Sequence, residues 1–264
     1  MSFVMDRIQE HYQYATKNFN QDNVIGIFLT GSQNYGTDMP FSDVDTKLLV
    51  TPTLDDIYHD RRGESSTMKM PDDSNELISI KDIRTAIFEI KKQNINMLEL
   101  LYTDYCILNP AYKKTWELLV SKREEIVRYN TYLAAKATKG NALNGYDRMY
   151  KENGEINQKQ VANLVRYEYY LTQYLGGVDY LNCLRPDEDT VRLIKQIRSG
   201  EIGRGALVAI GDASAANIQK LSDDYCETHL NVNNILLENF FDDILKNFID
   251  ISFLSEYNRK GVEI

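Results

Sequence analysis

Two short apolar runs with a polar loop between them constrain the fold of this chain more than any other feature. The first run covers residues 24–29 and leads into Gly31-Ser32, and the second covers residues 44–50 and begins beside Asp43. Short apolar runs that are bounded by Gly, Pro, Asp and Ser are typical of buried strands. We therefore predict two strands whose connecting loop carries polar side chains.

Two carboxylates open the second predicted strand. Side chains at positions i and i+2 of a strand share one face, so Asp43 and Asp45 are expected to point the same way. Such a pair is repulsive unless a cation lies between the two groups. Carboxylate oxygens suit Mg²⁺, which typically binds one or two carboxylates together with substrate phosphates. The pattern predicts a magnesium site, at which Mn²⁺ is the alternative ion.

Gly31 and Ser32 stand at the C-terminal end of the first predicted strand. A glycine at this point lets backbone amides turn toward an anion, and the serine hydroxyl can join them on a phosphate oxygen. Either feature alone, the Gly-Ser turn or the Asp-x-Asp pair, is more often structural. Their occurrence together, each beside a strand, favours a site for a phosphate-bearing ligand.

A third carboxylate on a neighbouring strand would complete a site for two metal ions, one activating an incoming hydroxyl and the other holding a triphosphate. Glu76 is the preferred candidate, because it opens a third apolar run at residues 77–80 and strand alternation can place it beside the aspartates. The alternatives are Asp72, Asp73 and Asp82.

Periodicity divides the chain into two parts. Residues 4–19 have the apolar spacing of a helix, and residues 52–74 are polar and are predicted to form an exposed, mobile loop that can act as a lid. From Asn109-Pro110 onward, amphipathic helical patterns replace strand patterns. The expected organisation is an α+β fold with a sheet domain, residues 1–108, followed by an all-helical domain, residues 109–264.

Composition and charge exclude several classes of protein. The net charge of −9 argues against broad affinity for nucleic acid, although residues 111–204 carry 16 basic and 12 acidic side chains. Three cysteines without a Cys-x-x-Cys pair support neither a disulfide framework nor a zinc site. The sequence contains neither a signal-like N-terminus nor a run of about 18 apolar residues. We expect a cytoplasmic protein with no membrane partner.

The polar loop resembles the signature of a known family. The run from Gly31 to Gly36, the nine-residue gap between Ser32 and Ser42, and Asp43-Val44-Asp45 are similar to the motif of the DNA polymerase β nucleotidyltransferase superfamily. Within it, the chain resembles the predicted nucleotidyltransferases associated with phage RNA ligase. The resemblance is specific over residues 23–50, extends over 76–101, which include Asn94-Ile95-Asn96-Met97-Leu98-Glu99-Leu100-Leu101, and is loose over 130–204.

This resemblance implies a small mixed sheet flanked by helices, followed by a helical domain. It also implies transfer of a nucleoside monophosphate from a nucleoside triphosphate, with ATP favoured, to an acceptor hydroxyl, with release of pyrophosphate. Two Mg²⁺ ions are expected. The third position of the family motif is usually Asp, so a Glu there reaches one methylene further. The resemblance assigns Asp43, Asp45 and Glu76 to the metal ions and Ser32 to the triphosphate. Gly31 and Ser42 are the other residues of this segment that are predicted to bind the nucleotide.

A predicted helix in the second half offers cations to the same ligand. Lys159, Asn163, Arg166 and Tyr170 recur at spacings of four, three and four, which places them on one helical face. A triphosphate beside an acidic metal site needs cations, so Lys159 and Arg166 are predicted to bind the nucleotide. A solvated surface explains the same pattern. The weaker candidate cations are Lys136 and Lys139.

The acceptor is open at this point, and so is turnover itself. An RNA end, such as that of a tRNA, fits the resemblance and the positive middle segment, whereas a protein or small-molecule hydroxyl suits the same chemistry. The alternative function is a non-catalytic nucleotide-binding or antitoxin-like module of the same fold. A purely structural partner protein would leave the aspartates at the strand end unexplained.

Overall fold

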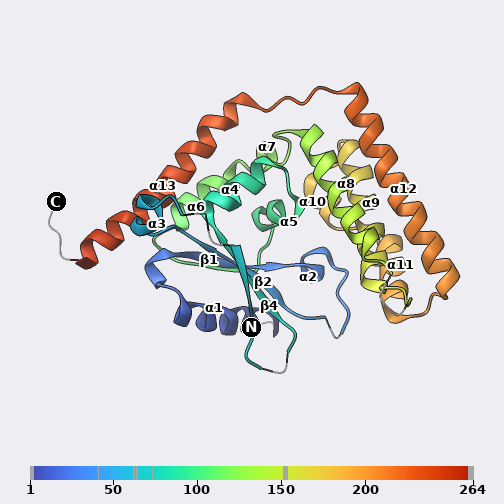
Figure 1. The fold of residues 1–264 in the computed structure, drawn as a ribbon, viewed down its shortest axis with the longest axis horizontal. Coiled ribbons are helices and arrows are strands. Elements are labelled where there is room, and N and C mark those ends of the chain that lie inside the picture. Colours follow the sequence, from blue (N-terminus) through green and yellow to red (C-terminus); the bar gives the residue numbers. More distant parts are fainter. Residues whose placement is uncertain are drawn as a thin grey trace.

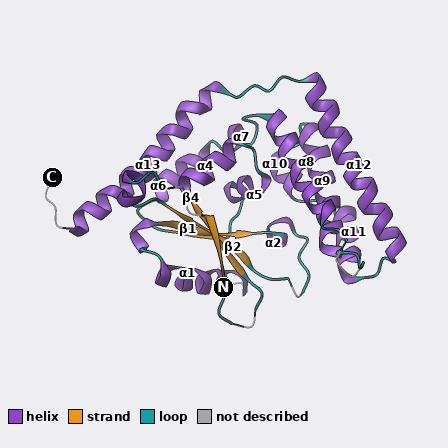
Figure 2. Cartoon of the chain, viewed as in Figure 1, coloured by secondary structure: helices purple, strands orange, loops and turns teal. Residues whose placement is uncertain are grey.

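The computed structural model describes residues 3–40, 42–61, 63, 65–72, 74–150 and 154–260. Its centre is one five-stranded mixed sheet with helices on both faces, followed along the chain by a helical region (Figure 1). Figure 2 shows the strands gathered at this centre and surrounded by helices. The expected α+β class is confirmed. The strands are β1 (Val24–Thr30), β2 (Asp45–Val50), β3 (Ser65–Lys69), β4 (Leu77–Asp82) and β5 (Cys106–Leu108).

The strands lie in the order β3-β4-β2-β1-β5. β1 pairs antiparallel with β2 and with β5, β2 and β4 are parallel, and β3 runs antiparallel to β4. The antiparallel register places Thr30, the last residue of β1, opposite Asp45, the first residue of β2. The turn that follows β1 and the aspartates that open β2 therefore lie side by side.

Different helices cover the two faces of the sheet. α1 (Phe3–Asn18) packs on one face, where its Ile8 belongs to the same apolar cluster as Leu48, Ile78 and Ile80. On the other face, Leu49 belongs to a larger cluster that includes α4 (Ile83–Lys91) and the later helices. Because side chains alternate along a strand, the even-numbered positions of β2 and β4 face α1 and the odd-numbered positions face the helical region.

The helical region is built around α9 (Gln158–Leu175). This helix packs against α8 (Thr131–Asp147), α10 (Tyr180–Leu184), α11 (Glu188–Ser199) and α12 (Arg204–Thr228), as its apolar spacing predicts. α6 (Lys113–Ser121) and the last helix, α13 (Ile235–Lys260), instead lie with α4 over the sheet (Figure 1). One apolar cluster joins all of these helices to the sheet, and the division into domains 1–108 and 109–264 stays a prediction.

The chain passes into the helical region and back again at two neighbouring crossings. The first crossing leads into α8 through Tyr129 and Asn130, and the second connects α12 to α13. Asn130 Nδ2 donates hydrogen bonds to Asn231 Oδ1 at 2.8 Å and to Asn233 Oδ1 at 2.6 Å. The backbone N–H of Asn234 donates to the Tyr129 carbonyl at 2.9 Å. The two crossings are thus hydrogen-bonded to each other.

Residues 52–74 differ from the predicted mobile loop. They contain α3 (Leu54–Tyr58), which begins with a capping box at Thr53, and β3, which pairs with β4 at the edge of the sheet. Edge strands tolerate polar, exposed side chains, so the sequence of β3 lacks the apolar run by which a strand is predicted. Asp73 lies outside the described residues. The remaining short elements are η1 (Gln21–Asn23), α2 (Ser32–Tyr35), α5 (Ile95–Leu98), η2 (Glu99–Leu101) and α7 (Arg123–Ile126).

Candidate functional site

Gly31 turns the chain sharply at the end of β1. Its backbone φ of +84° is one that glycine adopts far more readily than other residues do. The one-turn helix α2 follows directly and ends at Tyr35, and the next residue, Gly36, has a φ of +70°. Asn34 Nδ2 donates to the Leu29 carbonyl at 2.7 Å and ties α2 back to β1. The position of Ser32, which opens α2, is therefore fixed by the local backbone.

A cavity of about 560 Å³ lies where this turn faces the helical region. β1, β2 and α2 supply one wall, and α9 and α11 supply the other. Residues that are more than 110 positions apart in sequence meet across it. Of the eight site residues predicted from the sequence, Glu76 does not line this cavity. Those that do are Gly31, Ser32, Ser42, Asp43, Asp45, Lys159 and Arg166.

Asp43 and Asp45 both face the cavity, as strand alternation predicts, and Val44 between them is buried in the cluster beneath α1. Asp45 Oδ1 accepts a hydrogen bond from the backbone N–H of Leu77 at 3.0 Å. Burial raises the pKa of Asp45, and the nearby negative charges of Asp43 and Glu76 add to this rise. Within the part of the chain that the structure describes, neither aspartate forms an ion pair. The pair is thus an electronegative site that a cation would stabilise.

The opposite wall is cationic. Arg166 is buried, and its guanidinium lies 4.2 Å from the ring centre of Tyr35 and 4.5 Å from that of Tyr167. Its Nη1 has no hydrogen-bond partner among the described residues. The positive charge of Lys159 opposes the rise in the pKa of Asp45 and so acts across the cavity. These two cations offer charge-assisted hydrogen bonds to an anionic ligand.

Two further members of the predicted polar face remain. Asn163 lines the cavity, whereas Tyr170 is buried against Tyr174 and Tyr180 and does not line it. The residues of α9 that line the cavity end at Tyr167. The weaker candidates are also elsewhere. Lys139 pairs with Asp223 of α12 at 2.6 Å, and Lys136 lies over the ring of Tyr132.

A polar group in the wall of the cavity was not predicted from the sequence. The Tyr35 hydroxyl donates to the Glu99 carboxylate, and Lys47 Nζ donates to the Asn96 carbonyl at 2.6 Å. Burial raises the pKa of Glu99 and of Tyr35 and lowers that of Lys47. The charges of Lys47 and Arg166 oppose the rise at Glu99. One signal was present, because Lys47 stands two positions after Asp45 and shares its strand face.

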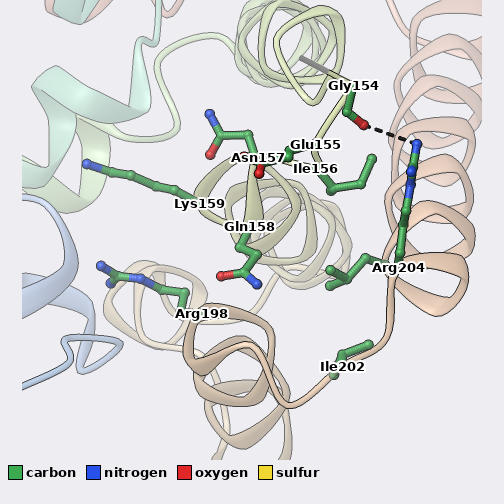
Figure 3. Close-up of a pocket in the computed structure, with 10 residues that line it drawn as sticks. Gly154, Glu155, Ile156, Asn157, Gln158, Lys159, Arg198, Ile202 and Arg204 are labelled. Atoms are coloured by element: carbon green, nitrogen blue, oxygen red, sulfur yellow. Dashed lines mark hydrogen bonds between the residues drawn. The ribbon is translucent and has the colours of Figure 1, made fainter. Parts of the chain in front are cut away.

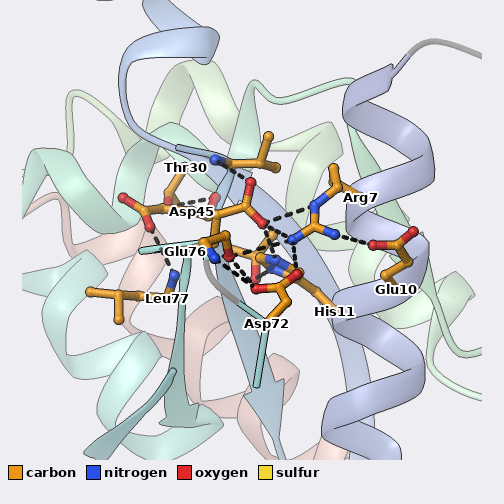
Figure 4. A network of polar contacts seen from close by, with 11 residues as sticks. Arg7, Glu10, His11, Thr30, Asp45, Asp72, Glu76 and Leu77 are labelled. Atoms are coloured by element: carbon orange, nitrogen blue, oxygen red, sulfur yellow. Dashed lines mark hydrogen bonds and ion pairs between the residues drawn. The ribbon is translucent and has the colours of Figure 1, made fainter. Parts of the chain in front are cut away.

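Glu76 lies on the α1 side of the sheet, among the even-numbered positions. Its carboxylate forms an ion pair with Arg7, accepts from His11 Nε2 at 3.1 Å and accepts from the backbone N–H of Val44 at 3.1 Å (Figure 4). Burial alone would raise the pKa of Glu76, but the hydrogen bonds from Arg7, Val44 and His11 outweigh it, so this pKa is lowered. The carboxylate is held as an anion away from the cavity.

The alternatives to Glu76 are also engaged elsewhere. Asp72 pairs with Arg7 at 2.8 Å, and hydrogen bonds from Ser74 and Arg7 lower its pKa to about 2. Asp82 pairs with Arg84 at 2.8 Å and accepts from the Arg84 backbone N–H at the start of α4. Neither residue lines the cavity.

A second hollow of about 660 Å³ adjoins the first. Lys159 and Arg198 line both, and Figure 3 shows their side chains extending toward the same side, where the segment after β1 lies. Arg198 Nη1 donates to the Thr37 carbonyl at 3.3 Å, and Arg204 Nη2 donates to the Gly154 carbonyl at 3.1 Å. Arg198 is thus a further cation at the site, and it links α11 to the loop that carries the aspartates.

The donor set fits magnesium only in part. No group of three or more His, Cys, Asp or Glu residues is arranged to hold a metal ion in the described ranges. Asp43 and Asp45 supply two carboxylates, which is the number that Mg²⁺ uses when phosphates and water complete its shell. A metal–nucleotide complex therefore fits this cavity better than a free ion does.

Comparison with known proteins adds no assignment. No protein-family model matches the chain, and no curated protein matches its sequence. Among the described helices, none combines the length and the apolar character needed to cross a membrane.

Proposed function

We propose that this chain is a metal-dependent nucleotidyltransferase that moves a nucleoside monophosphate from a nucleoside triphosphate, with ATP favoured, to an acceptor hydroxyl. One observation carries the proposal: a single cavity sets two carboxylates without ion-pair partners in the described structure against Lys159 and Arg166. The resemblance of residues 31–45 to the DNA polymerase β superfamily supports it. Pyrophosphate is the second product.

The two walls of the cavity have complementary tasks in this reaction. Asp43 and Asp45 would hold Mg²⁺ or Mn²⁺, and the bound ion would neutralise developing charge on the phosphates. Gly31, Ser32 and Ser42 lie beside the aspartates, where amide and hydroxyl groups can contact phosphate oxygens. Lys159 and Arg166 face the remaining charge of the triphosphate from α9. The acceptor oxygen bonds to the α-phosphorus and its proton passes to water, while the bond between the α-phosphorus and the pyrophosphate oxygen breaks.

The direct test is transfer of a label. The purified protein is incubated with each of the four α-labelled nucleoside triphosphates, Mg²⁺ and three classes of acceptor, namely RNA including tRNA, protein and small polyhydroxyl compounds. We expect label on one class of acceptor, release of pyrophosphate, and loss of both on chelation of the metal. The double variant Asp43→Ala/Asp45→Ala is the negative control, and equal labelling by that variant would contradict the proposal.

The cationic wall makes a graded prediction. Arg166→Met removes a buried cation and is expected to weaken binding of the magnesium–nucleotide complex about 10- to 100-fold, which corresponds to one lost charge-assisted hydrogen bond. Lys159→Met removes a more accessible cation and should have a smaller effect. Calorimetric titration with a non-hydrolysable triphosphate measures both. Wild-type affinity in the Arg166 variant would remove this residue from the nucleotide site.

A second candidate function is favoured by the placement of Glu76. Glu76 is held by Arg7 and His11, and Glu99, the third carboxylate in the cavity wall, accepts the Tyr35 hydroxyl. Only Asp43 and Asp45 are therefore available to a metal ion, and a non-catalytic nucleotide-binding or antitoxin-like module needs no third carboxylate. Calorimetric binding of a triphosphate without any pyrophosphate release would favour this candidate over the transferase. The second metal ion that the resemblance implies stays a prediction.

A further inference from the structure

The polar network on the α1 face of the sheet is built against the back of the aspartate segment (Figure 4). We propose that Glu76, Arg7 and His11 are positioning residues, which hold the backbone around Asp43 and Asp45 so that both carboxylates project into the cavity. This inference rests on the proposed function for its catalytic consequence. The contacts themselves do not depend on it.

The network contacts Val44 and Thr46, the residues that alternate with the two aspartates along the chain. Glu76 Oε1 accepts from the backbone N–H of Val44 at 3.1 Å, and His11 Nδ1 lies 2.9 Å from Thr46 Oγ1. Val44 and Thr46 follow Asp43 and Asp45 in turn. Val44 belongs to the apolar cluster beneath α1, and Thr46, which also borders the cavity, presents its hydroxyl to His11 of α1. The network therefore fixes the intervening residues from behind without touching the carboxylates that the metal would use.

Glu76 and its neighbour Leu77 hold the segment from two sides. The Glu76 side chain binds the amide of Val44, and the backbone N–H of Leu77 donates to Asp45 Oδ1 at 3.0 Å. The start of β4 thus sets both the strand position and the direction of one carboxylate. A shift of β4 by a fraction of an ångström would reach the metal site, and misplacements of about 1 Å can cost 100-fold in rate.

Glu76 is itself fixed by α1. Arg7 Nε donates to its Oε2 at 2.9 Å, and His11 Nε2 lies 3.1 Å from the same oxygen. Glu76 and His11 are buried, and Arg7 is mostly covered. Both carboxylate oxygens therefore already have donors, and turning Glu76 toward the cavity would leave the buried His11 Nε2 without its acceptor and would break the Arg7–Glu76 ion pair. Such a loss is costly, and this favours a structural carboxylate over a third metal ligand.

The first test asks whether the network holds Val44. Amide hydrogen exchange is measured on the wild-type chain and on Arg7→Met, Glu76→Gln and Glu10→Gln. Glu10 is the matched control, because it is an exposed partner of Arg7 that does not contact Glu76. We expect exchange at Val44 to accelerate at least about tenfold in the first two variants and to be unchanged in the third. Unchanged exchange in Arg7→Met would overturn the inference whether or not the chain transfers nucleotides.

The second test separates positioning from metal binding. Disrupting groups that orient metal ligands typically lowers activity about 10- to 100-fold. We therefore expect Arg7→Met and Glu76→Gln to lower kcat by similar factors in that range and to leave the KM for the nucleotide near its wild-type value. The double variant Arg7→Met/Glu76→Gln should have a kcat no lower than that of the less active single variant. If Glu76 binds metal, Glu76→Gln alone raises the Mg²⁺ concentration for half-maximal rate while Arg7→Met does not, and that result overturns the inference.

A third variant pair covers the case in which Glu76→Gln does not fold. Thr46→Val keeps the shape of the side chain and removes the hydroxyl that faces His11, whereas Thr46→Ser keeps it. We expect a drop in kcat of about tenfold in the first variant and rescue in the second. Equal rates in Thr46→Val and the wild-type chain would contradict a positioning role for His11. Absence of transfer in the wild-type chain would instead refute the proposed function, and the exchange at Val44 would still decide the contact.

Discussion

Asp45→Asn is expected to lower the rate of nucleotidyl transfer about 10³-fold while leaving the fold intact. The change removes one of two anionic ligands from the cavity, and the charge stabilisation that a bound metal supplies amounts to several kcal/mol, or about 4 kcal/mol for this factor. Asp45 is the more enclosed of the two aspartates, and its Oδ1 is already oriented by the Leu77 amide. Asn keeps that acceptor oxygen and loses the charge.

Single-turnover kinetics at saturating triphosphate measure this loss of transfer rate. A titration with Mg²⁺ and then Mn²⁺ tests whether the loss comes from removing a metal ligand. The matched control is Asp38→Asn, since Asp38 lies on the same loop and does not line the cavity. A rate within a few-fold of the control in Asp45→Asn would mean that Asp45 is not a metal ligand. Asp43→Asn should reproduce the loss, because both carboxylates face the cavity.

Glu99→Gln is expected to lower the free energy of unfolding by about 3 kcal/mol, the scale on which an uncompensated buried charge destabilises a protein. Burial lowers the pKa of Lys47, and the charge of Glu99 is the largest influence that opposes this shift. The same carboxylate accepts the Tyr35 hydroxyl and lies near Arg166. Without it, two buried cations lose a compensating negative charge.

Denaturant unfolding followed by far-ultraviolet circular dichroism gives this change in free energy. Glu125→Gln is the control, because it makes the same substitution in an exposed ion pair with Lys122 and should cost less than about 1 kcal/mol. Equal stabilities of the two variants would show that Glu99 does not compensate the buried cations. A loss at Glu99 should also weaken nucleotide binding, since Tyr35 and Arg166 line the cavity.

The strands that the sequence predicts are those with an apolar signature. β1, β2 and β4 are buried on at least one face by Ile, Leu and Val residues, so their runs are visible locally. β3 lies at the edge of the sheet with exposed side chains, and β5 spans three residues beside β1. Their pairing depends on neighbours that are distant in sequence, and no local pattern marks it.

The site shows the same division between local and distant causes. Asp43 and Asp45 are expected on one face because they are two positions apart, and both line the cavity although β2 begins only at Asp45. The face of the sheet on which Glu76 lies depends on whether the even- or the odd-numbered positions of β4 face α1. Ile78 and Ile80 are buried beneath α1, and Glu76 goes with them to meet Arg7, 69 positions away. Because Leu77 and Ile78 are both apolar, the sequence does not reveal which of these two sets of positions faces α1.

The paired crossings at Asn130 and Asn231 have a mechanical consequence. A helical region that is connected to a sheet by a single linker can swing freely. Here two chain segments connect the helical region to the sheet, and they are hydrogen-bonded to each other. The two segments act as one pivot. We expect any opening of the cavity to be a rotation of α9 and α11 about that pivot, with the greatest travel at Lys159 and Arg198 and almost none at Tyr129.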